Sequence, residues 1–257
     1  MCNKDIKKLP FWETVGRSFK YVLKNKKLLL ALLPVVAVLT VIQIVLKTPV
    51  MCVYNEGFCS SNWQNTLSGL TLVITAVGII INYCRSIVCK ETVDFTSLKF
   101  LKRAGFYILW SFLLTFVIGI PVVIAIIILS ITGADVNILL LTSMCLFFIV
   151  GTALAPLIIA FPALAVDDYK LINLSKLFNL CKGNKMAIFF GQFVIMFPYM
   201  LLSKMFVYIY ALIGANSFAV NICFAVITLL MLAIDASFRG AFFAHIYQFL
   251  KYYNKDK

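Results

Sequence analysis

Residues 154–185, LAPLIIAFPALAVDDYKLINLSKLFNLCKGNK, join an apolar run with two prolines to a pair of acids and then to a basic, amphipathic segment. Pro156 and Pro162 each remove a backbone donor, which a helix in lipid tolerates only where neighbours or water satisfy the freed carbonyls. We therefore expect this helix end to be packed or kinked. The whole stretch is typical of a helix that leaves a bilayer and turns along its surface.

The segment after the two acids has apolar residues at helical spacing, with lysines among and after them. The apolar positions are Leu171, Leu174, Phe178 and Cys181, and the basic ones are Lys170, Lys176, Lys182 and Lys185. A helix here would place one face among lipid headgroups and the other against anionic phosphate. We interpret Asp167 and Asp168 as helix-capping or interfacial residues, because adjacent residues point to different sides of a helix.

The composition indicates an integral membrane protein. Hydrophobic residues make up 63% of the 257-residue chain and charged residues 13%, and the mean hydropathy is +1.00, far from the values of soluble domains. Loops between the apolar runs leave no segment long enough for a separate soluble domain. The net charge of +13 sits in short patches beside apolar runs, which indicates membrane topology and argues against a nucleic-acid partner.

Six apolar runs are long enough to cross a bilayer, since about 20 helical residues span roughly 30 Å of hydrocarbon. The expected spans are residues 28–46, 67–88, 106–131, 138–166, 186–213 and 218–250. We predict an all-α fold, a single domain over residues 1–257 that forms a bundle of six transmembrane helices. It would comprise a cytoplasmic segment over 1–27 with an amphipathic helix, the bundle over 28–250, and a cytoplasmic tail over 251–257.

Interfacial helices are expected before three of the spans, over residues 11–24, 92–104 and 170–182. In the first, one face carries Trp12, Val15, Phe19, Val22 and Leu23, and another carries Glu13, Arg17, Lys20 and Lys24. A threefold repeat of surface helix plus hairpin is a hypothesis supported by Ser18, Ser97 and Ser175 at spacings of 79 and 78 residues, and by Pro34, Pro121 and Pro198. It requires that each surface helix be separate from the following span.

The distribution of lysine and arginine predicts the orientation. Of the 23 such residues, 21 lie on the side of both termini, which we therefore place in the cytoplasm. Residues 47–65, 132–137 and 214–217 would face outward. Cys52 and Cys59 share the first of these loops; they could form a disulfide in an oxidising compartment, and a free pair is a close alternative.

A few charged and small residues inside apolar runs are candidate functional or packing residues. Lys204 is interpreted as a lysine that extends to the outer interface, with a functional site as the alternative. Asp235 and Arg239 are four apart and are expected to pair on one helix face, with a proton relay or substrate site as the alternative. Gly240 belongs to rows of small residues that let helices approach closely.

No motif for catalysis, a metal or a cofactor is found. His245 is the single histidine, and neither HExxH, GxSxG nor a Walker-type loop occurs. The expectation is a protein that is not an enzyme and that holds no cofactor and no metal.

Short motifs lie around the last three spans: Pro156 and Pro162 before Asp167, then Ser175 with Leu180, Cys181, Lys182, Gly183 and Asn184, and finally Ser237, Phe238, Arg239, Gly240 and Ala241 running to Tyr247. In this combination the chain resembles bacterial membrane proteins related to the glycerophosphodiester phosphodiesterase membrane domain, together with six-span relatives. The resemblance spans nearly the whole chain and implies a bacterial cytoplasmic membrane. In relatives that are phosphodiesterases, catalysis belongs to a separate soluble domain, so no catalytic residue is carried over.

We therefore expect a non-enzymatic membrane protein that organises lipids or partner proteins at the cytoplasmic leaflet. Its partners would be anionic lipids, and a membrane-protein partner or a second copy of the chain is also possible. The alternative is a small transporter with a polar pathway that includes Lys204 and Gln192. A continuous cavity lined by both residues would favour transport, and a dry, filled bundle would favour organisation.

Overall fold

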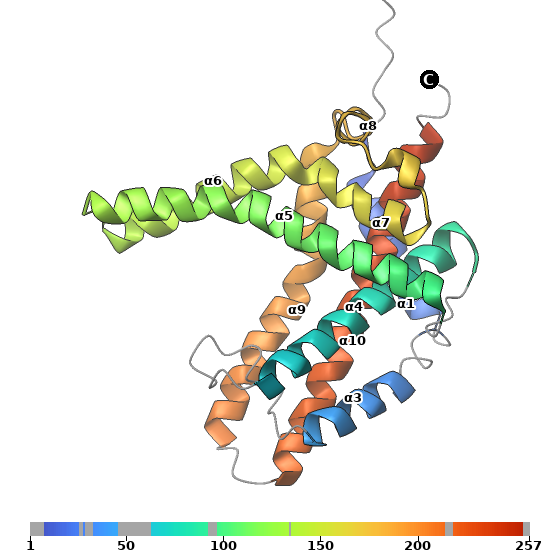
Figure 1. Cartoon of the computed structure of the whole chain (residues 1–257), viewed down its shortest axis with the longest axis vertical. Helices are drawn as coiled ribbons and strands as arrows, with labels where there is room; N and C mark the ends of the chain where they lie inside the picture. Colours follow the sequence, from blue (N-terminus) through green and yellow to red (C-terminus); the bar gives the residue numbers. More distant parts are fainter. Residues whose placement is uncertain are drawn as a thin grey trace, which may run out of the picture.

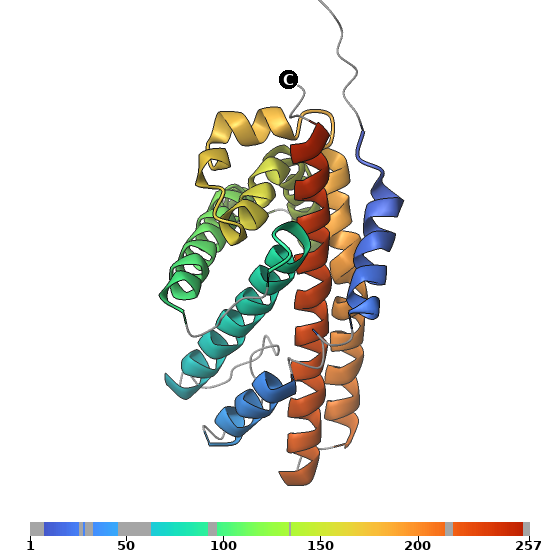
Figure 2. The same cartoon turned by 90° about the vertical axis from the view of Figure 1, so that its right-hand side faces the viewer.

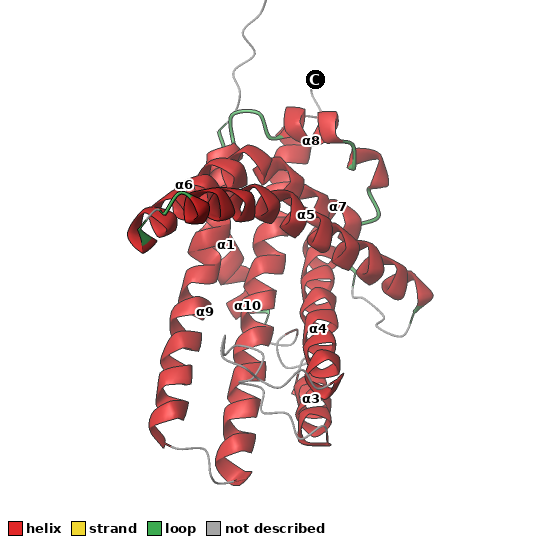
Figure 3. Cartoon of the chain, turned by 60° about the vertical axis from the view of Figure 1, so that its left-hand side comes forward, coloured by secondary structure: helices red, strands yellow, loops and turns green. Residues whose placement is uncertain are grey.

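The structure is a computed structural model of the full chain and describes residues 8–25, 28, 33–45, 63–91, 97–133, 135–213 and 218–253. Within these ranges the protein is helical and contains no strand (Figure 3). The elements in chain order are α1 Phe11–Lys24, α3 Leu33–Val45, α4 Trp63–Val88, α5 Leu98–Ile131, α6 Val136–Leu154, η2 Ala155–Ile159, α7 Ala160–Ala165, η3 Tyr169–Leu171, α8 Leu174–Leu180, α9 Lys185–Ile213 and α10 Phe218–Tyr253.

Five of these helical segments are long and apolar enough to cross a membrane: residues 69–88, 98–131, 137–165, 185–213 and 222–252. The chain is therefore a multi-pass membrane protein. The first expected span, over residues 28–46, is described only in part, and its helix α3 is shorter than the other five.

α10 is the central helix, and its closest neighbour is α4 (Figure 1). The two helices meet at Gly240, where an added Cβ would lie 2.9 Å from the Ile80 carbonyl oxygen and 2.9 Å from the Tyr83 Cβ. The rows of small residues predicted on this helix are buried: Ala233, Ser237 and Ala241 on one, Ala236, Gly240 and Ala244 on the other. Small side chains thus permit the close contact that the sequence predicts.

The two prolines of the opening stretch lie where the α-helical hydrogen-bond pattern changes. Pro156 is in the first turn of the 3₁₀ segment η2, and Pro162 is in the first turn and a half of α7. All eleven residues of Ala155–Ile159 and Ala160–Ala165 are buried, and the Leu157 carbonyl accepts a hydrogen bond from Trp110 Nε1 at 3.0 Å. The predicted packed and irregular helix end is confirmed.

α5 and α6 form an antiparallel hairpin that runs across α9 and α10 rather than alongside them (Figures 1 and 3). The most apolar part of α5 has only 6% of its residues buried within the protein. At 1.5 Å per residue, 34 residues extend for about 51 Å, which exceeds roughly 30 Å of hydrocarbon. The length of α5 thus allows it to cross a bilayer at a steep tilt.

The expected surface helices are found in altered form. α1 is a separate helix that packs along α10 and α9 (Figure 2). It buries Val15 and Val22 of its expected apolar face and leaves Trp12 and Leu23 exposed. Residues 170–182 do not form one helix, because Ile172 and Asn173 are not helical and separate η3 from α8. The Asn173 side chain caps α8 by accepting a hydrogen bond from the Ser175 amide.

The surface helix predicted over residues 92–104 is wrong for the part that the structure describes. Residues 98–104 are the first turns of α5, which begins after the N-cap Ser97 and continues without interruption to Ile131. The threefold repeat therefore lacks its second separate surface helix. The apolar residues from Phe106 onward continue the same helix into the span, and Lys99 and Lys102 lie in its first two turns.

Candidate functional site

The turn that follows α7 carries the two adjacent acids and has the hydrogen bonds of a Schellman helix end. The Asp168 amide donates to the Ala163 carbonyl at 2.9 Å, and the Asp167 amide donates to the Leu164 carbonyl at 3.3 Å. Asp167 has a φ of 61°, the left-handed conformation for which glycine is the usual residue. After glycine, Asp and Asn are the residues that adopt this conformation most readily, and the Asp167 carboxylate has a further role.

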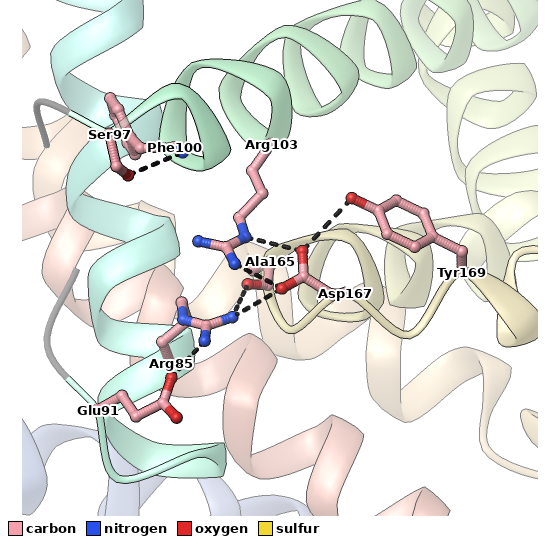
Figure 4. Close-up of polar contacts among 8 residues, drawn as sticks. All are labelled: Arg85, Glu91, Ser97, Phe100, Arg103, Ala165, Asp167 and Tyr169. Carbon is pink, nitrogen blue, oxygen red and sulfur yellow. Dashed lines mark hydrogen bonds and ion pairs between the residues drawn. The ribbon is translucent and has the colours of Figure 1, made fainter. Parts of the chain in front are cut away.

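That role is visible in the contacts of the Asp167 side chain (Figure 4). Arg103 of α5 donates to it twice, from Nε to Oδ1 at 2.7 Å and from Nη2 to Oδ2 at 2.5 Å. Arg85 of α4 donates from Nη1 to Oδ2 at 3.2 Å and to the Ala165 carbonyl at 3.3 Å. Tyr169 donates its hydroxyl to Oδ1 at 3.3 Å. Arg85 also pairs with Glu91.

Asp168 points to a different helix. Its Oδ2 accepts from the Tyr247 hydroxyl at 2.5 Å and from Lys251 Nζ at 2.8 Å, both on α10. Lys251 donates to the Tyr247 hydroxyl at 2.9 Å as well. The expectation that adjacent acids diverge is confirmed. Side-chain capping is not found: Asp167 caps α7 through its backbone, and Asp168 precedes η3 without a side-chain cap.

We call these residues the aspartate-turn network: Arg85, Glu91, Arg103, Asp167, Asp168, Tyr169, Tyr247 and Lys251. It joins the end of α4, the start of α5, the turn after α7 and the end of α10. The arginine side chains are mostly buried, with exposed fractions of 13% for Arg85 and 10% for Arg103. A two-pronged guanidinium–carboxylate pair is geometrically specific, so this network fixes how four segments meet at one end of the protein.

The network also sets the charge state of both acids. Hydrogen bonds from Arg103 hold the pKa of Asp167 below its ordinary value. Burial acts to raise the pKa of Asp168, but hydrogen bonds from Lys251 and Tyr247 outweigh it and lower that pKa. Both groups are therefore carboxylates at neutral pH, and neither is poised to exchange a proton there.

The predicted pair of Asp235 and Arg239 is present on α10. The Asp235 side chain is 1% exposed, and that of Arg239 is 22% exposed. Asp235 Oδ2 is the oxygen that contacts Arg239. Among the described residues, Asp235 Oδ1 and Arg239 Nε are buried without a hydrogen-bond partner.

The other predicted residues do not gather into one site. Lys204 is exposed on α9, and Gln192 donates to the sulfur of Met196. Pro156, Pro162 and Gly240 lie in the packed interior. Cys52 and Cys59 are outside the described residues. In the ranges that the structure describes, no group of three or more His, Cys, Asp or Glu residues could hold a metal ion.

In the sequence, Arg85, Arg103 and Lys251 contribute only to the topology prediction, and their contacts with Asp167 and Asp168 were not predicted. One signal was available, the choice between arginine and lysine. The chain has four arginines, and each pairs with an acid: Arg17 with Glu13, Arg85 with Asp167 and Glu91, Arg103 with Asp167, and Arg239 with Asp235. Of the described lysines, Lys251 alone forms an ion pair. Arginine suits partly buried, two-pronged pairs better than lysine does.

Comparisons with protein-family models, curated proteins and solved structures give no match for this chain.

Proposed function

We propose that this chain is a non-enzymatic membrane protein that gathers anionic lipids at the cytoplasmic leaflet of a bacterial inner membrane. The observation that carries the proposal is that the arginines form ion pairs within the protein, whereas most of the described lysines are exposed and form none. In the aspartate-turn network, Arg85, Arg103 and Lys251 pair with Glu91, Asp167 and Asp168, so the exposed lysines near it keep uncompensated positive charge. Unpaired surface lysines suit phosphate headgroups, and arginine pairs hold the helices that present them.

These lysines come from α1 and the residues before it, from the residues after α4, from the start of α5 and from the segment between α7 and α9; the last three groups adjoin the aspartate-turn network at one end of the protein. Apart from Lys204 on α9, the exposed lysines without an ion pair among the described residues are Lys8, Lys20, Lys24, Lys90, Lys99, Lys102, Lys170, Lys176 and Lys182. The start of α1 is tied to this end by the Leu9 amide, which donates to Asn184 Oδ1 at 2.6 Å. Each lysine near an anionic leaflet contributes about 1 kcal/mol of attraction, so together they favour a phosphate-rich surface strongly.

The topology that goes with this function has six crossings and cytoplasmic termini. The five long apolar helices supply five crossings, and we assign the sixth to the segment around α3. The first and last described residues lie at the same end of the protein, as an even number of crossings requires (Figure 2). In the sequence, 21 of the 23 basic residues fall on the predicted side of the termini, and this bias supports a cytoplasmic assignment. We keep the resemblance to the glycerophosphodiester phosphodiesterase membrane domain as part of this proposal, because it implies a bacterial cytoplasmic membrane.

Lipid selectivity measured on reconstituted protein tests the proposal. The protein is placed in nanodiscs with equal phosphatidylglycerol and phosphatidylcholine, released under gentle conditions, and the lipids that remain bound are counted by native mass spectrometry. We expect phosphatidylglycerol to be enriched, and the enrichment to fall in a variant with Lys99, Lys102, Lys176 and Lys182 changed to Gln. Lys204→Gln is the matched control, because it removes an exposed lysine far from the network.

Two results would contradict the proposal. One is equal retention of both lipids by the wild type at low and moderate salt, where attraction to headgroups is strongest. The other is a loss of selectivity in Lys204→Gln that equals the loss in the fourfold variant. Either result would mean that the lysines at this end do not choose the lipid.

A further inference from the structure

A cavity of about 130 Å³ lies between α1, α9 and α10. It is lined by Phe19, Ile195, Pro198, Tyr199, Leu202, Met231, Ile234, Asp235 and Phe238. Eight of these nine residues are apolar or aromatic, and the exception is a carboxylate. Neither Lys204 nor Gln192 belongs to the lining, so this cavity is distinct from the transport pathway considered above.

Only one of the two carboxylate oxygens of Asp235 has a hydrogen-bond partner among the described residues. Asp235 Oδ2 contacts Arg239, whereas Oδ1 has no hydrogen-bond partner in the described part of the chain. An ionised oxygen left unpaired in an apolar setting is costly, and a donor that reaches it is correspondingly favourable. Asp235 is the one acidic residue among the described residues of the lining, so its Oδ1 is the acceptor that an occupant would meet.

These features define the chemistry of an occupant. The unpaired Oδ1 of Asp235 calls for a hydrogen-bond donor, and the surrounding aromatic and aliphatic side chains call for an apolar body. Arg239 already balances the charge of Asp235, so a cationic ligand would leave net positive charge in an apolar site. A neutral hydroxyl meets all three conditions. The volume is close to that of a cavity that holds benzene, so the hydroxyl-bearing end must be compact.

The rim indicates where such a molecule enters. Leu202 on α9 and Ile234 on α10 line the cavity and are exposed. Both lie within helical segments that can cross a membrane. Access is therefore from the lipid side. We propose that this cavity binds the hydroxyl end of a neutral apolar alcohol that arrives from the bilayer, with Asp235 Oδ1 as the acceptor.

Photolabelling tests this site independently of the lysines, in liposomes of phosphatidylcholine without anionic lipid. The probes are an eight-carbon alcohol that carries a diazirine and the methyl ether of the same molecule, which accepts hydrogen bonds but cannot donate. We expect the alcohol to label residues 195–202 and 231–238, and the ether to label them at least about tenfold less, because a hydrogen bond to a charged group is lost.

Two substitutions on α9 provide the matched control. Leu202→Trp fills the rim of the cavity and should reduce labelling to background. Leu201→Trp adds the same bulk at an exposed neighbour that is outside the lining and should leave labelling unchanged. Both positions are exposed, so folding should tolerate both changes. The Asp235→Asn variant should lower labelling by the alcohol toward that of the ether.

A second arm identifies the natural source of the hydroxyl. A photoreactive diacylglycerol is incorporated into the same liposomes. Labelling by this lipid at residues 195–202 and 231–238 supports a lipid ligand, and labelling by the short alcohol alone supports a free small alcohol. Three results would overturn the site: equal labelling by the eight-carbon alcohol and its ether, no labelling by the eight-carbon alcohol or the diacylglycerol, or unchanged labelling in Leu202→Trp.

Discussion

Arg103 at the start of α5 holds Asp167 through two hydrogen bonds, from Nε to Oδ1 at 2.7 Å and from Nη2 to Oδ2 at 2.5 Å. The two residues are 64 positions apart in the chain. The contact fixes the start of α5 against the turn after α7, which the chain reaches after the hairpin of α5 and α6. Asp167 thus has two roles: its left-handed backbone ends α7, and its side chain binds Arg103 of α5.

Asp167→Asn separates the charge of this residue from its backbone conformation, because asparagine also tolerates the left-handed region. The substitution leaves Arg85 and Arg103 without their shared carboxylate, and we expect a loss of about 1–2 kcal/mol of stability after allowance for solvent. Thermal unfolding in detergent measures it. Asp135→Asn is the control, since Asp135 is exposed at the tip of the hairpin and has no ion pair among the described residues.

Stability should also depend on acid pH through the two aspartates. Both pKa values are lowered in the folded protein from an ordinary value of 3.8. Their contribution is therefore complete above that value and is lost as pH falls through the lowered pKa. The difference in Tm between wild type and the Asp167→Asn, Asp168→Asn double variant should stay constant from about pH 7 to 5 and shrink below about pH 4. A difference that shrinks already near pH 6 would contradict the assignment.

Gly240→Ala tests the contact between α4 and α10. The added methyl would lie 2.9 Å from the Ile80 carbonyl oxygen, and backbone cannot move aside as a flexible side chain can. We expect a loss of about 1–3 kcal/mol or more. The matched change is Gly105→Ala, a helical glycine of α5 with nothing within 4 Å of the new atom, which should be neutral or slightly stabilising. Equal melting temperatures would show that the close approach does not matter.

Hydropathy was sufficient to predict the five long apolar helices, because a span must bury about 20 apolar residues whatever its neighbours are. The pair of Asp235 and Arg239 and the small residues around Gly240 were predictable for a related reason: both follow from positions four apart on one helix. The start of α5 was missed, since it lies at Leu98 and not at residue 106. The break between Ile172 and Asn173 was missed, since helical spacing of apolar residues continues across it and only the cap at Asn173 marks the start of α8.

Contacts between distant segments could not be predicted in this way. Arg103 and Asp167 are brought together by the return of the hairpin, and nothing in their local sequences names the partner. The same holds for Tyr247 with Asp168, which are 79 residues apart. The path of α5 across α9 is also a tertiary property, because an apolar helix satisfies its own backbone at any tilt.

The orientation of the termini is tested best by cysteine reporters at the two ends of α9. Native Cys181 is fully buried, and burial raises the pKa of its thiol to about 12, so it would stay unlabelled in either orientation. Lys182→Cys and Ile213→Cys place thiols at exposed positions instead. The background keeps the buried Cys84 and Cys181 and replaces the other native cysteines by serine or alanine.

With a membrane-impermeant maleimide on intact cells, the proposed topology predicts labelling of the Ile213→Cys protein alone. The Lys182→Cys protein should react only after the membrane is permeabilised, because the lysine-rich end of α9 would face the cytoplasm. Fluorescence of the purified protein gives the extent of each reaction, and full labelling in permeabilised cells serves as the reference. Labelling of Lys182→Cys on intact cells would reverse the orientation. It would also turn Lys176 and Lys182 away from the leaflet on which the proposed lipid binding depends.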